Sequence, residues 1–463
     1  KVLVEKLLRS CPGIATLYLL IRPKKGVDVE TRCKELLSNP IFDQIRKDQG
    51  WVLDKVKALE GDVTLPAMGL SDQDIYRVLN EVTIMFHSAA TVKFNEPFKE
   101  AVRFNTSATQ KVVKFCNTIK NLKVMIHVST AYSNSDKQII QEVVYPPPAN
   151  PDCIIKCCQE LDEDLLVGLE TNLLKKNHPN TYTLTKAMAE WIVLQESTRI
   201  PTVIVRPSIV TAAWKEPAPG WIDNSTGITG VMMGMVTGTL RTIICNNDLV
   251  VDLMPVDIVV NTIIAVAWHA QSQRNNGVSV YNCTSGLQNK ISWGELRRFV
   301  EKYSLLYPTK YIQWYPSFTF RTNRPMHWAC HNLFHVLPAF IIDIICRLQG
   351  YKPRMMRICD KFKRATRAGE FFALREWEFS AENQNCLRND MSEKDRIIFD
   401  TDLSQITWDT YFKHYMVGIR KYVLKDSLDS LASAKRKLNR FYWLHRITQF
   451  LTAFLVLKLV GFR

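Results

Sequence analysis

Residues 124–134 read VMIHVSTAYSN, an apolar, β-branched run that ends in hydroxyl side chains. Similar apolar runs occur at 15–22, 56–64, 82–90 and 201–210, and amphipathic stretches separate them. Short apolar runs that alternate with helical patterns predict βαβ units, and therefore a parallel sheet with helices on both faces. We expect an α/β fold in which a doubly wound parallel sheet forms the first half of the chain.

The overall charge limits the classes of partner. A formal charge of +15 over 463 residues favours an anionic partner, such as a nucleic acid, an acidic membrane or a phosphorylated small molecule. No nucleic-acid-binding module is recognisable, so we expect no nucleic-acid partner. The 12 cysteines include no C-x-x-C pair. The absence of this metal-binding spacing indicates reduced thiols rather than a metal site.

The strand ends predict a dinucleotide site, because ligands of such sheets bind beyond the carboxyl ends of the strands. The run 15–22 ends in Arg22 where an acidic residue would bind a ribose 2′-hydroxyl, and arginine suits a 2′-phosphate instead. This favours NADPH over NADH, with a solvated basic turn as the alternative. The expected cofactor-binding residues are Arg22, Lys24, Asp62, Val63, Ser88, Ala89, Ala90, Lys186, Pro207 and Ser208.

The stretch NTYTLTKAMAEW, residues 180–191, supplies the candidate catalytic pair. Tyr182 and Lys186 are four positions apart and share one face of a predicted helix. An ammonium beside a phenol stabilises the phenolate, so we expect the lysine to lower the tyrosine pKa and make it a general acid. Thr130 or Ser129, after the preceding strand, would hold the substrate oxygen where negative charge develops.

Longer stretches carry a family resemblance. LIRPK, HSAATVKF, HVSTAYSN, YTLTKAMAE, VRPSIV, EPAPGWIDN and MPVDIVVN resemble the extended short-chain dehydrogenase/reductases, and more closely the alcohol-forming fatty acyl-CoA reductases. The resemblance implies a Rossmann-like domain and two NADPH-dependent hydride transfers that convert a long-chain acyl-CoA to a primary alcohol with release of CoA. It implies that Tyr182 is the proton donor, Lys186 its activator and ribose anchor, and Thr130 the carbonyl-orienting residue, with Ser129 as the alternative.

Further site residues follow from the same resemblance. Asn105, in FNTSAT, either completes the proton relay or is an ordinary polar residue inside a helix. EPAPGWIDN is the most discriminating stretch, because a generic dehydrogenase fold does not require it. We expect Trp214, Gly220 and Trp221 to contact the substrate.

One departure from the family bears on activity. Members open with a strand and a glycine-rich turn of the type T-G-x-x-G-F-x-G, whose amides cradle the pyrophosphate. This sequence begins where that turn would have ended, so we expect either a fragment or a naturally shortened, impaired enzyme. The alternatives are an extended dehydrogenase or epimerase acting on a sugar nucleotide or sterol, and a non-catalytic lipid- or membrane-binding protein.

The predicted domains are a reductase domain at 1–290, a helical C-terminal domain at 291–430, and a basic, aromatic flank with an apolar tail at 431–463. Within the first, residues 227–251 mix small and bulky apolar side chains. They line an acyl tunnel or belong to a buried core.

The tail predicts membrane association. Residues 447–462 read ITQFLTAFLVLKLVGF and follow KRKLNRFYWLHR, which is basic and aromatic as at a membrane interface. The run is shorter than the ~20 residues of a spanning helix, so an interfacial helix, a longer anchor and a core helix are alternatives. The resemblance implies the peroxisomal membrane with the catalytic domain facing the cytosol, and a product used for ether lipids or waxes. It is also compatible with a homodimer.

Overall fold

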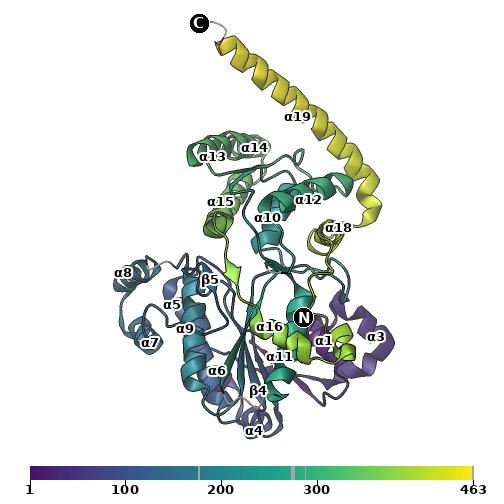
Figure 1. The fold of residues 1–463 in the computed structure, drawn as a ribbon. Coiled ribbons are helices and arrows are strands. Elements are labelled where there is room, and N and C mark those ends of the chain that lie inside the picture. The colour runs from purple at the N-terminus through teal and green to yellow at the C-terminus, as the bar shows by residue number, and fades with distance from the viewer. Residues whose placement is uncertain (25, 176–177, 273–276, 287, 461–463) are drawn as a thin grey trace. The chain divides into compact units, whose positions relative to one another are not determined.

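The computed structural model describes residues 1–463 except 25, 176–177, 273–276, 287 and 461–463. The chain forms two compact units, each assembled from separate segments (Figure 1). Unit 1 contains residues 1–210, 252–289 and 377–405, and unit 2 contains 211–251, 290–376 and 406–463.

Unit 1 is an α/β domain, as the sequence predicts. Its helices and strands, with η for 3-10 or π-helical turns, are α1 (Val2–Ser10), β1 (Leu17–Ile21), α2 (Val29–Leu37), η1 (Pro40–Phe42), α3 (Asp43–Gln49), η2 (Gly50–Lys55), β2 (Val56–Glu60), η3 (Pro66–Gly69), α4 (Asp72–Glu81), β3 (Ile84–His87), α5 (Phe98–Ala101), η4 (Val102–Ser107), α6 (Ala108–Cys116), β4 (Val124–Val128), β5 (Ile139–Ile140), α7 (Pro151–Glu160), α8 (Glu163–Leu174), α9 (Thr181–Glu196), β6 (Thr202–Pro207), β9 (Leu253–Pro255), α11 (Val256–Ser272), β10 (Val278–Cys283), β12 (Glu378–Phe379), α16 (Glu382–Asp390) and α17 (Glu393–Ile398).

The five apolar runs form β1, β2, β3, β4 and β6, which confirms the strand predictions. Strands β10, β6, β4 and β3 form a four-stranded sheet in that order, and β1 pairs with β2. All of these pairings are parallel, and His87 of β3 lies beside His127 of β4 in the register. The carboxyl ends of the strands therefore meet at one edge in each sheet, where the sequence places its polar residues.

Helices cover both faces of the four-stranded sheet. On one face α6 and α9 pack on the strands, and Val112, Met125, Val193 and Ile204 from α6, β4, α9 and β6 share one core cluster. On the other face α11 packs on β4 and β6 (Figure 1). Such two-sided cover explains why these strands read as continuous apolar runs rather than alternating ones.

The compact units do not follow the predicted domain boundaries. The segment 211–251, expected in the first domain, belongs to unit 2, whereas 377–405, expected in the helical domain, belongs to unit 1. The late segment is held by β12, which pairs with β5, and by Asn282, whose side-chain amide donates to the carbonyls of Ile140 (3.1 Å) and Ser380 (3.0 Å). Local sequence patterns carry no sign of such distant pairings, because each strand involved has two residues.

Unit 2 is mainly helical, as expected for the C-terminal region. Strand β7 (Ile209–Thr211) lies where the chain leaves unit 1. The elements of unit 2 are α10 (Gly227–Val236), β8 (Thr242–Ile244), α12 (Trp293–Leu306), β11 (Thr319–Arg321), α13 (Arg324–His331), η5 (Asn332–Val336), α14 (Leu337–Leu348), α15 (Met355–Ala373), α18 (Trp408–Gly418), η6 (Ile419–Val423), η7 (Leu428–Ser430) and α19 (Leu431–Val460).

The predicted apolar tail is the second half of α19. This helix begins at Leu431 and runs without a break through the basic, aromatic flank to Val460. Its large apolar side chains, such as Phe450 and Leu457, are exposed. The last predicted tail residues, Gly461 and Phe462, lie outside the described residues.

Candidate functional site

Helix α9 brings the candidate catalytic pair to the carboxyl end of β4. The helix is capped by Asn180, whose side-chain oxygen accepts the Thr183 N–H at 2.9 Å. One helical turn separates Tyr182 from Lys186. The buried Lys186 ammonium donates to the carbonyl of Val128, the last residue of β4, at 2.8 Å.

The two candidate hydroxyls after β4 have different partners. The Thr130 side chain hydrogen-bonds to Tyr182. The Ser129 hydroxyl instead donates to the Glu190 carboxylate at 2.5 Å. Of the two residues that the sequence left open, Thr130 is therefore the one whose hydroxyl lies at the tyrosine.

Burial sets the protonation of the pair. It raises the pKa of Tyr182 to about 12, against the hydrogen bond from Thr130, which lowers it. Burial also lowers the pKa of Lys186 to about 8, and the Glu190 charge opposes that shift. The sequence predicted a lowered tyrosine pKa. In the structure the direction is the reverse, because loss of solvation disfavours the phenolate. At neutral pH Tyr182 is a protonated phenol, the form that a proton donor needs.

Asn105 lies in a π-helical turn and connects two parts of the site. Its buried amide oxygen accepts the Thr91 N–H at 2.9 Å, and its nitrogen donates to the Thr185 hydroxyl at 3.0 Å. Thr91 follows β3, whereas Thr185 lies between the catalytic candidates on α9. The side chain thus holds the loop after β3 against α9. Its part in a proton relay stays a prediction.

A buried ion pair next to the candidate catalytic lysine was missed by sequence reasoning. Glu190 and Arg206 are fully buried, and their side chains meet at 2.7 Å (Nη2–Oε2) and 3.0 Å (Nε–Oε1). The same carboxylate accepts the hydroxyls of Ser129 at 2.5 Å and Ser133 at 3.0 Å. One signal was available: Glu190 follows Lys186 by four positions, as Lys186 follows Tyr182, so the three share one face of α9.

Two buried histidines, also missed, lie at the carboxyl ends of β3 and β4. The rings of His87 and His127 are 5.2 Å apart between centroids, and His87 Nε2 lies 3.0 Å from the Thr109 hydroxyl. Burial and the nearby Lys186 charge lower the pKa of His87 to about 3 and that of His127 well below its ordinary value. Both rings are therefore neutral at physiological pH and add no charge that would oppose the ammonium of Lys186.

The expected 2′-phosphate residue, Arg22, lies directly after β1. Its side chain is 51% exposed, forms an ion pair with Asp62 at 2.9 Å, and places its guanidinium 4.9 Å from the Phe104 ring centroid. Asp62 also accepts the Thr64 N–H at 2.9 Å, so the carboxylate is fixed after β2. Lys24 is exposed in the following turn.

The remaining expected cofactor residues also lie near strand ends. Ser88 and Ala89 are exposed after β3, and Ala90 is half-buried. Val63 packs on the core cluster, and Ser208 is buried after Pro207 of β6. A half-exposed cation after β1 and small, exposed residues after β3 fit an anionic dinucleotide that lies close to the backbone.

The expected substrate residues belong to unit 2 and have packing roles there. Gly220 has φ +77, and a Cβ on it would lie 2.1 Å from the His414 carbonyl oxygen. This explains the glycine of EPAPGWIDN, since only glycine allows the backbone to approach α18 so closely. Trp221 is buried, and the Lys215 ammonium lies 3.7 Å from the Trp214 ring centroid. Contact of these residues with substrate stays a prediction.

Unit 2 contains an apolar cavity of about 980 Å³. It is lined by residues of α13–α15 and α19 and by residues 238–242, which fall within the stretch expected to line an acyl tunnel. None of Trp214, Gly220 and Trp221 lines it.

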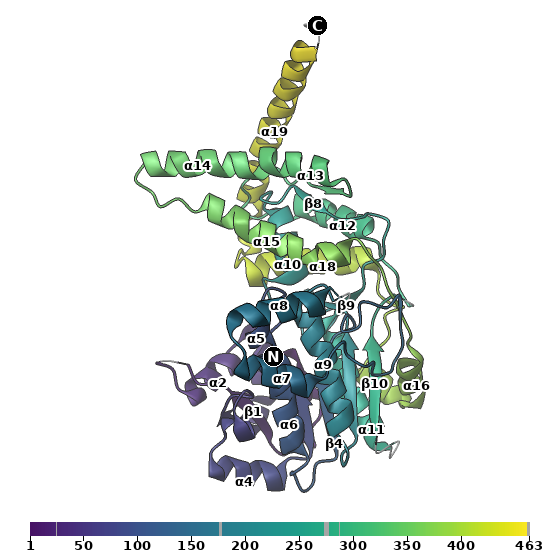
Figure 2. The same ribbon diagram turned by 90° about the vertical axis from the view of Figure 1, so that its left-hand side faces the viewer.

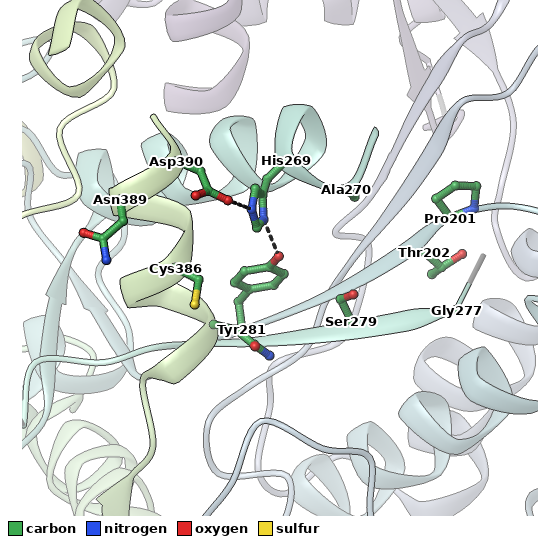
Figure 3. A pocket seen from close by; sticks show the side chains of 11 residues that line it. Pro201, Thr202, His269, Ala270, Gly277, Ser279, Tyr281, Cys386, Asn389 and Asp390 are labelled. Atoms are coloured by element: carbon green, nitrogen blue, oxygen red, sulfur yellow. Dashed lines mark hydrogen bonds and ion pairs between the residues drawn. The ribbon is translucent and has the colours of Figure 1, made fainter. Parts of the chain in front are cut away.

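A smaller cavity of about 370 Å³ lies in unit 1 at the beginning of β6 and β10 (Figure 3). His269 connects Tyr281 and Asp390 there, with its ring nitrogens 2.8 Å from the hydroxyl and 2.9 Å from the carboxylate. This edge is opposite to the strand ends that carry Thr130. We therefore assign the His269 cluster to the attachment of α16 and not to the catalytic site.

In the described part of the chain, no group of three or more His, Cys, Asp and Glu side chains is arranged to hold a metal ion. All 12 cysteines are free thiols.

Comparisons with known proteins agree with this architecture. A family model named NAD_binding_4 and described as "Male sterility protein" matches residues 1–263, and a second model, Sterile, with the same description, matches 334–426. Among solved structures, the terminal R domain of the myxalamid PKS-NRPS pathway has a TM-score of 0.58 at 16% identity, covering 90% of this chain and 86% of that one. The reductase domain of a nonribosomal peptide synthetase from Mycobacterium tuberculosis has a TM-score of 0.58 at 15% identity, covering 91% and 89%. These two likenesses show the reductase-type α/β fold.

Curated relatives match over nearly the whole chain. Fatty acyl-CoA reductase 1 of Rattus norvegicus is 38% identical, and that of Xenopus laevis is 39% identical, each over 95% of this chain and 85% of the relative. Fatty acyl-CoA reductase 2 of Bos taurus is 35% identical over 96% and 86%. At such identity and coverage, with the predicted tyrosine, lysine and threonine at the ends of parallel strands, the chain belongs to the fatty acyl-CoA reductase family.

Proposed function

We propose that this protein reduces a long-chain fatty acyl-CoA to the primary alcohol, with release of CoA, by two hydride transfers from NADPH. The observation that carries the proposal is the arrangement of Thr130, Tyr182 and Lys186 at the carboxyl end of β4, in a chain of the fatty acyl-CoA reductase family. A protonated phenol, a neighbouring hydroxyl and a buried ammonium are the groups that reduction of a carbonyl requires.

Each residue of the candidate site has a separate role in the proposed reduction. Bound NADPH supplies the hydride in each reduction step. The Tyr182 phenol donates its proton to the substrate oxygen as negative charge develops there, and Thr130 orients that oxygen by a hydrogen bond. Lys186 holds a positive charge beside the donor and would anchor the nicotinamide ribose. Glu190 favours the charged form of Lys186, because its carboxylate raises the lysine pKa.

Two features support the choice of cofactor and substrate class. The Arg22 guanidinium is presented after β1 and half-exposed, which suits the 2′-phosphate of NADPH. The apolar cavity of unit 2 suits an aliphatic chain, since burial of each methylene group against an apolar lining contributes ~0.8 kcal/mol of binding free energy.

Product analysis tests this function. The natural full-length protein that contains residues 1–463 is incubated with hexadecanoyl-CoA and NADPH, and the products are quantified by gas chromatography. We expect hexadecanol, with two NADPH oxidised for each alcohol formed. Aldehyde as the final product would contradict the second hydride transfer, and an unchanged thioester would contradict the proposal.

Replacing Arg22 tests the cofactor. Arg22→Ala should weaken binding of NADPH much more than binding of NADH, because only NADPH carries the 2′-phosphate that the guanidinium would grip in a charge-assisted pair. Isothermal calorimetry on both cofactors measures the effect, and Arg77→Ala, which removes an exposed arginine from α4, is the control. An equal loss of affinity for the two cofactors would show that Arg22 does not bind the 2′-phosphate.

We also propose that α19 anchors the protein, with the peroxisomal membrane as its site and the catalytic domain facing the cytosol. Support comes from the exposed apolar side chains of the helix, including Phe450, Phe454 and Leu457, and from the exposed Trp443 in the basic flank. A long-chain substrate and its alcohol product partition into bilayers, so an anchored enzyme meets both. The assembly into a homodimer and the use of the product for ether lipids or waxes rest on the family resemblance.

Deleting residues 440–463 tests the anchor. The intact protein should stay with the membrane pellet after extraction at alkaline pH, because an inserted apolar helix resists treatments that remove surface-bound proteins. The shortened protein should be released into the supernatant. If both forms are extracted equally, α19 is not an inserted anchor.

A further inference from the structure

In the described part of unit 2, a second apolar element leaves most of its large apolar side chains exposed. Helices α13 and α14 and the turn η5 between them form one continuous helix, Arg324–Leu348, called here the α13–α14 helix. By length and composition it is the one helix in the described part of the chain that is apolar enough to cross a membrane, and only 17% of its most apolar window is buried. The apolar core helix of a soluble protein would be mostly buried.

Helix α14 exposes its large apolar side chains, which is the reverse of an ordinary helix on a protein surface. Its large apolar side chains point outward: Phe340 is 54% exposed, Ile344 40% and Leu348 83%. The residues it buries within unit 2 are small or charged, namely Ala339 and Asp343. A contiguous apolar surface of this kind marks a site that another apolar phase or molecule covers.

Asp343 fixes this helix alongside α15. Its carboxylate accepts the N–H groups of Arg354, Met355 and Met356, at 2.9, 2.8 and 2.9 Å, and so caps the N-terminus of α15. Figure 2 shows α13 and α14 as a nearly straight rod beside α15. If α14 crossed a bilayer, it would carry this carboxylate and the attached end of α15 to membrane depth, which is costly. The α13–α14 helix is therefore suited to lie in the plane of a membrane.

The neighbouring helix α15 carries positive charge that is complementary to anionic lipid headgroups. Arg354, Arg357, Lys361 and Arg364 are exposed at intervals of three and four residues, so they form one basic stripe along α15. Exposed aromatic residues, Trp328 in α13 and Tyr351 after α14, are of the type that occupies the interface between lipid and water. Basic side chains beside an apolar surface match anionic headgroups above a hydrocarbon layer.

We propose that the α13–α14 helix inserts its apolar face into the surface of an anionic lipid bilayer, lying in the membrane plane, while the basic stripe of α15 contacts lipid headgroups. The site is distinct from α19 and independent of the reaction assigned above. A second copy of the chain would also cover the apolar face, but it would give no role to the basic stripe. The bilayer is therefore the occupant that accounts for both surfaces.

Local fluorescence tests the insertion in the full chain, even when α19 already holds the protein on the membrane. A solvent-sensitive fluorescent amino acid replaces Ile341, and in a matched protein it replaces Ile397, a 77% exposed isoleucine of unit 1. Vesicles of phosphatidylcholine and phosphatidylserine carry nitroxide quenchers near the headgroup or near the bilayer centre. We expect a blue shift and quenching at position 341, with the shallow quencher more effective than the deep one, and neither effect at position 397.

Variants separate the two surfaces. Phe340→Glu with Ile344→Glu should reduce the inserted fraction by at least about 100-fold, since each buried apolar side chain is worth about tenfold or more. Arg357→Gln with Arg364→Gln should weaken insertion by about fivefold for each charge on phosphatidylserine vesicles, and should have little effect on pure phosphatidylcholine. Leu165→Glu with Ile397→Glu, which changes exposed apolar residues elsewhere, is the matched control and should leave insertion unchanged.

Three results would overturn the proposal. In the first, the protein sediments with vesicles but the fluorophore at position 341 stays in water, which would mean that α19 alone binds the membrane. The second is stronger quenching from the bilayer centre, which would mean that the helix spans. The third is concentration-dependent self-association that shields position 341 without lipid, which would make this face an interface between copies. Turnover of soluble acyl-CoA is measured in parallel, so a failure of the assigned reaction is recognised separately.

Discussion

Replacing Tyr182 with phenylalanine should lower turnover of long-chain acyl-CoA by about 10²- to 10⁴-fold and leave NADPH affinity nearly unchanged. The reason is the loss of the proton donor. Burial raises the pKa of Tyr182 to about 12, so the wild-type phenol is protonated throughout the physiological range and has a proton to give. Phenylalanine keeps the ring that lies 5.7 Å from the Phe94 ring centroid, so the surrounding structure should persist.

The measurement is steady-state turnover together with calorimetric binding of NADPH. Tyr76→Phe is the matched control, because Tyr76 is 70% exposed on α4 and removal of its hydroxyl should not affect turnover. Turnover within a few-fold of wild type in the Tyr182→Phe protein would remove Tyr182 from the mechanism. A parallel loss of NADPH binding would instead indicate a disturbed site.

Replacing Arg206 with methionine should have the largest effect on stability, lowering the free energy of unfolding by about 3–5 kcal/mol. The substitution leaves the Glu190 carboxylate buried without its cation, 2.7 Å from where the guanidinium stood. It also removes the donors to the carbonyls of Gln141 and Val143, at 3.0 and 2.7 Å. A buried charge without a partner costs far more than the net value of the pair.

Urea denaturation measures this effect. Arg206→Met with Glu190→Met removes both charges and should cost less than the sum of the two single substitutions, since neither charge is then left unpaired. Arg103→Met breaks the exposed pair with Glu100 and should change the free energy of unfolding by less than about 1 kcal/mol. A cost below about 1 kcal/mol for Arg206→Met would mean that water or a rearranged side chain solvates Glu190 in the native protein.

Local patterns were sufficient to predict the strands and to place Tyr182 and Lys186 on one helix, whereas the catalytic roles of this pair stay predictions. Each of the five apolar runs forms a parallel strand. Strands β4 and β6 are buried almost throughout, and a strand buried on both faces needs an uninterrupted apolar sequence. Tyr182 and Lys186 share a helix face through their spacing alone. The position of Thr130 beside Tyr182 follows from the rule that strand ends of a parallel sheet meet at one edge.

Other features depend on the folded chain and left no local signal. The Ser129 hydroxyl donates to Glu190, and Thr130 is the residue whose hydroxyl lies at Tyr182. The partner of Glu190 is Arg206, on a strand that follows α9, so the pair forms only when helix and sheet pack together. The direction of the Tyr182 pKa shift depends on burial, which sequence spacing does not report.

The discontinuous build of unit 1 has a consequence for synthesis on the ribosome. Strand β12 and the Ser380 carbonyl complete unit 1 by joining β5 and Asn282, yet they are translated after most of unit 2. At ~5–20 residues per second, unit 1 waits roughly four to eighteen seconds between residue 289 and residue 377 for its last segment. During that delay the future partners of Phe379 and Ser380 are uncovered, so chaperones have their main opportunity to bind. A message broken before the codon for Trp377 would yield unit 1 without β12 and α16.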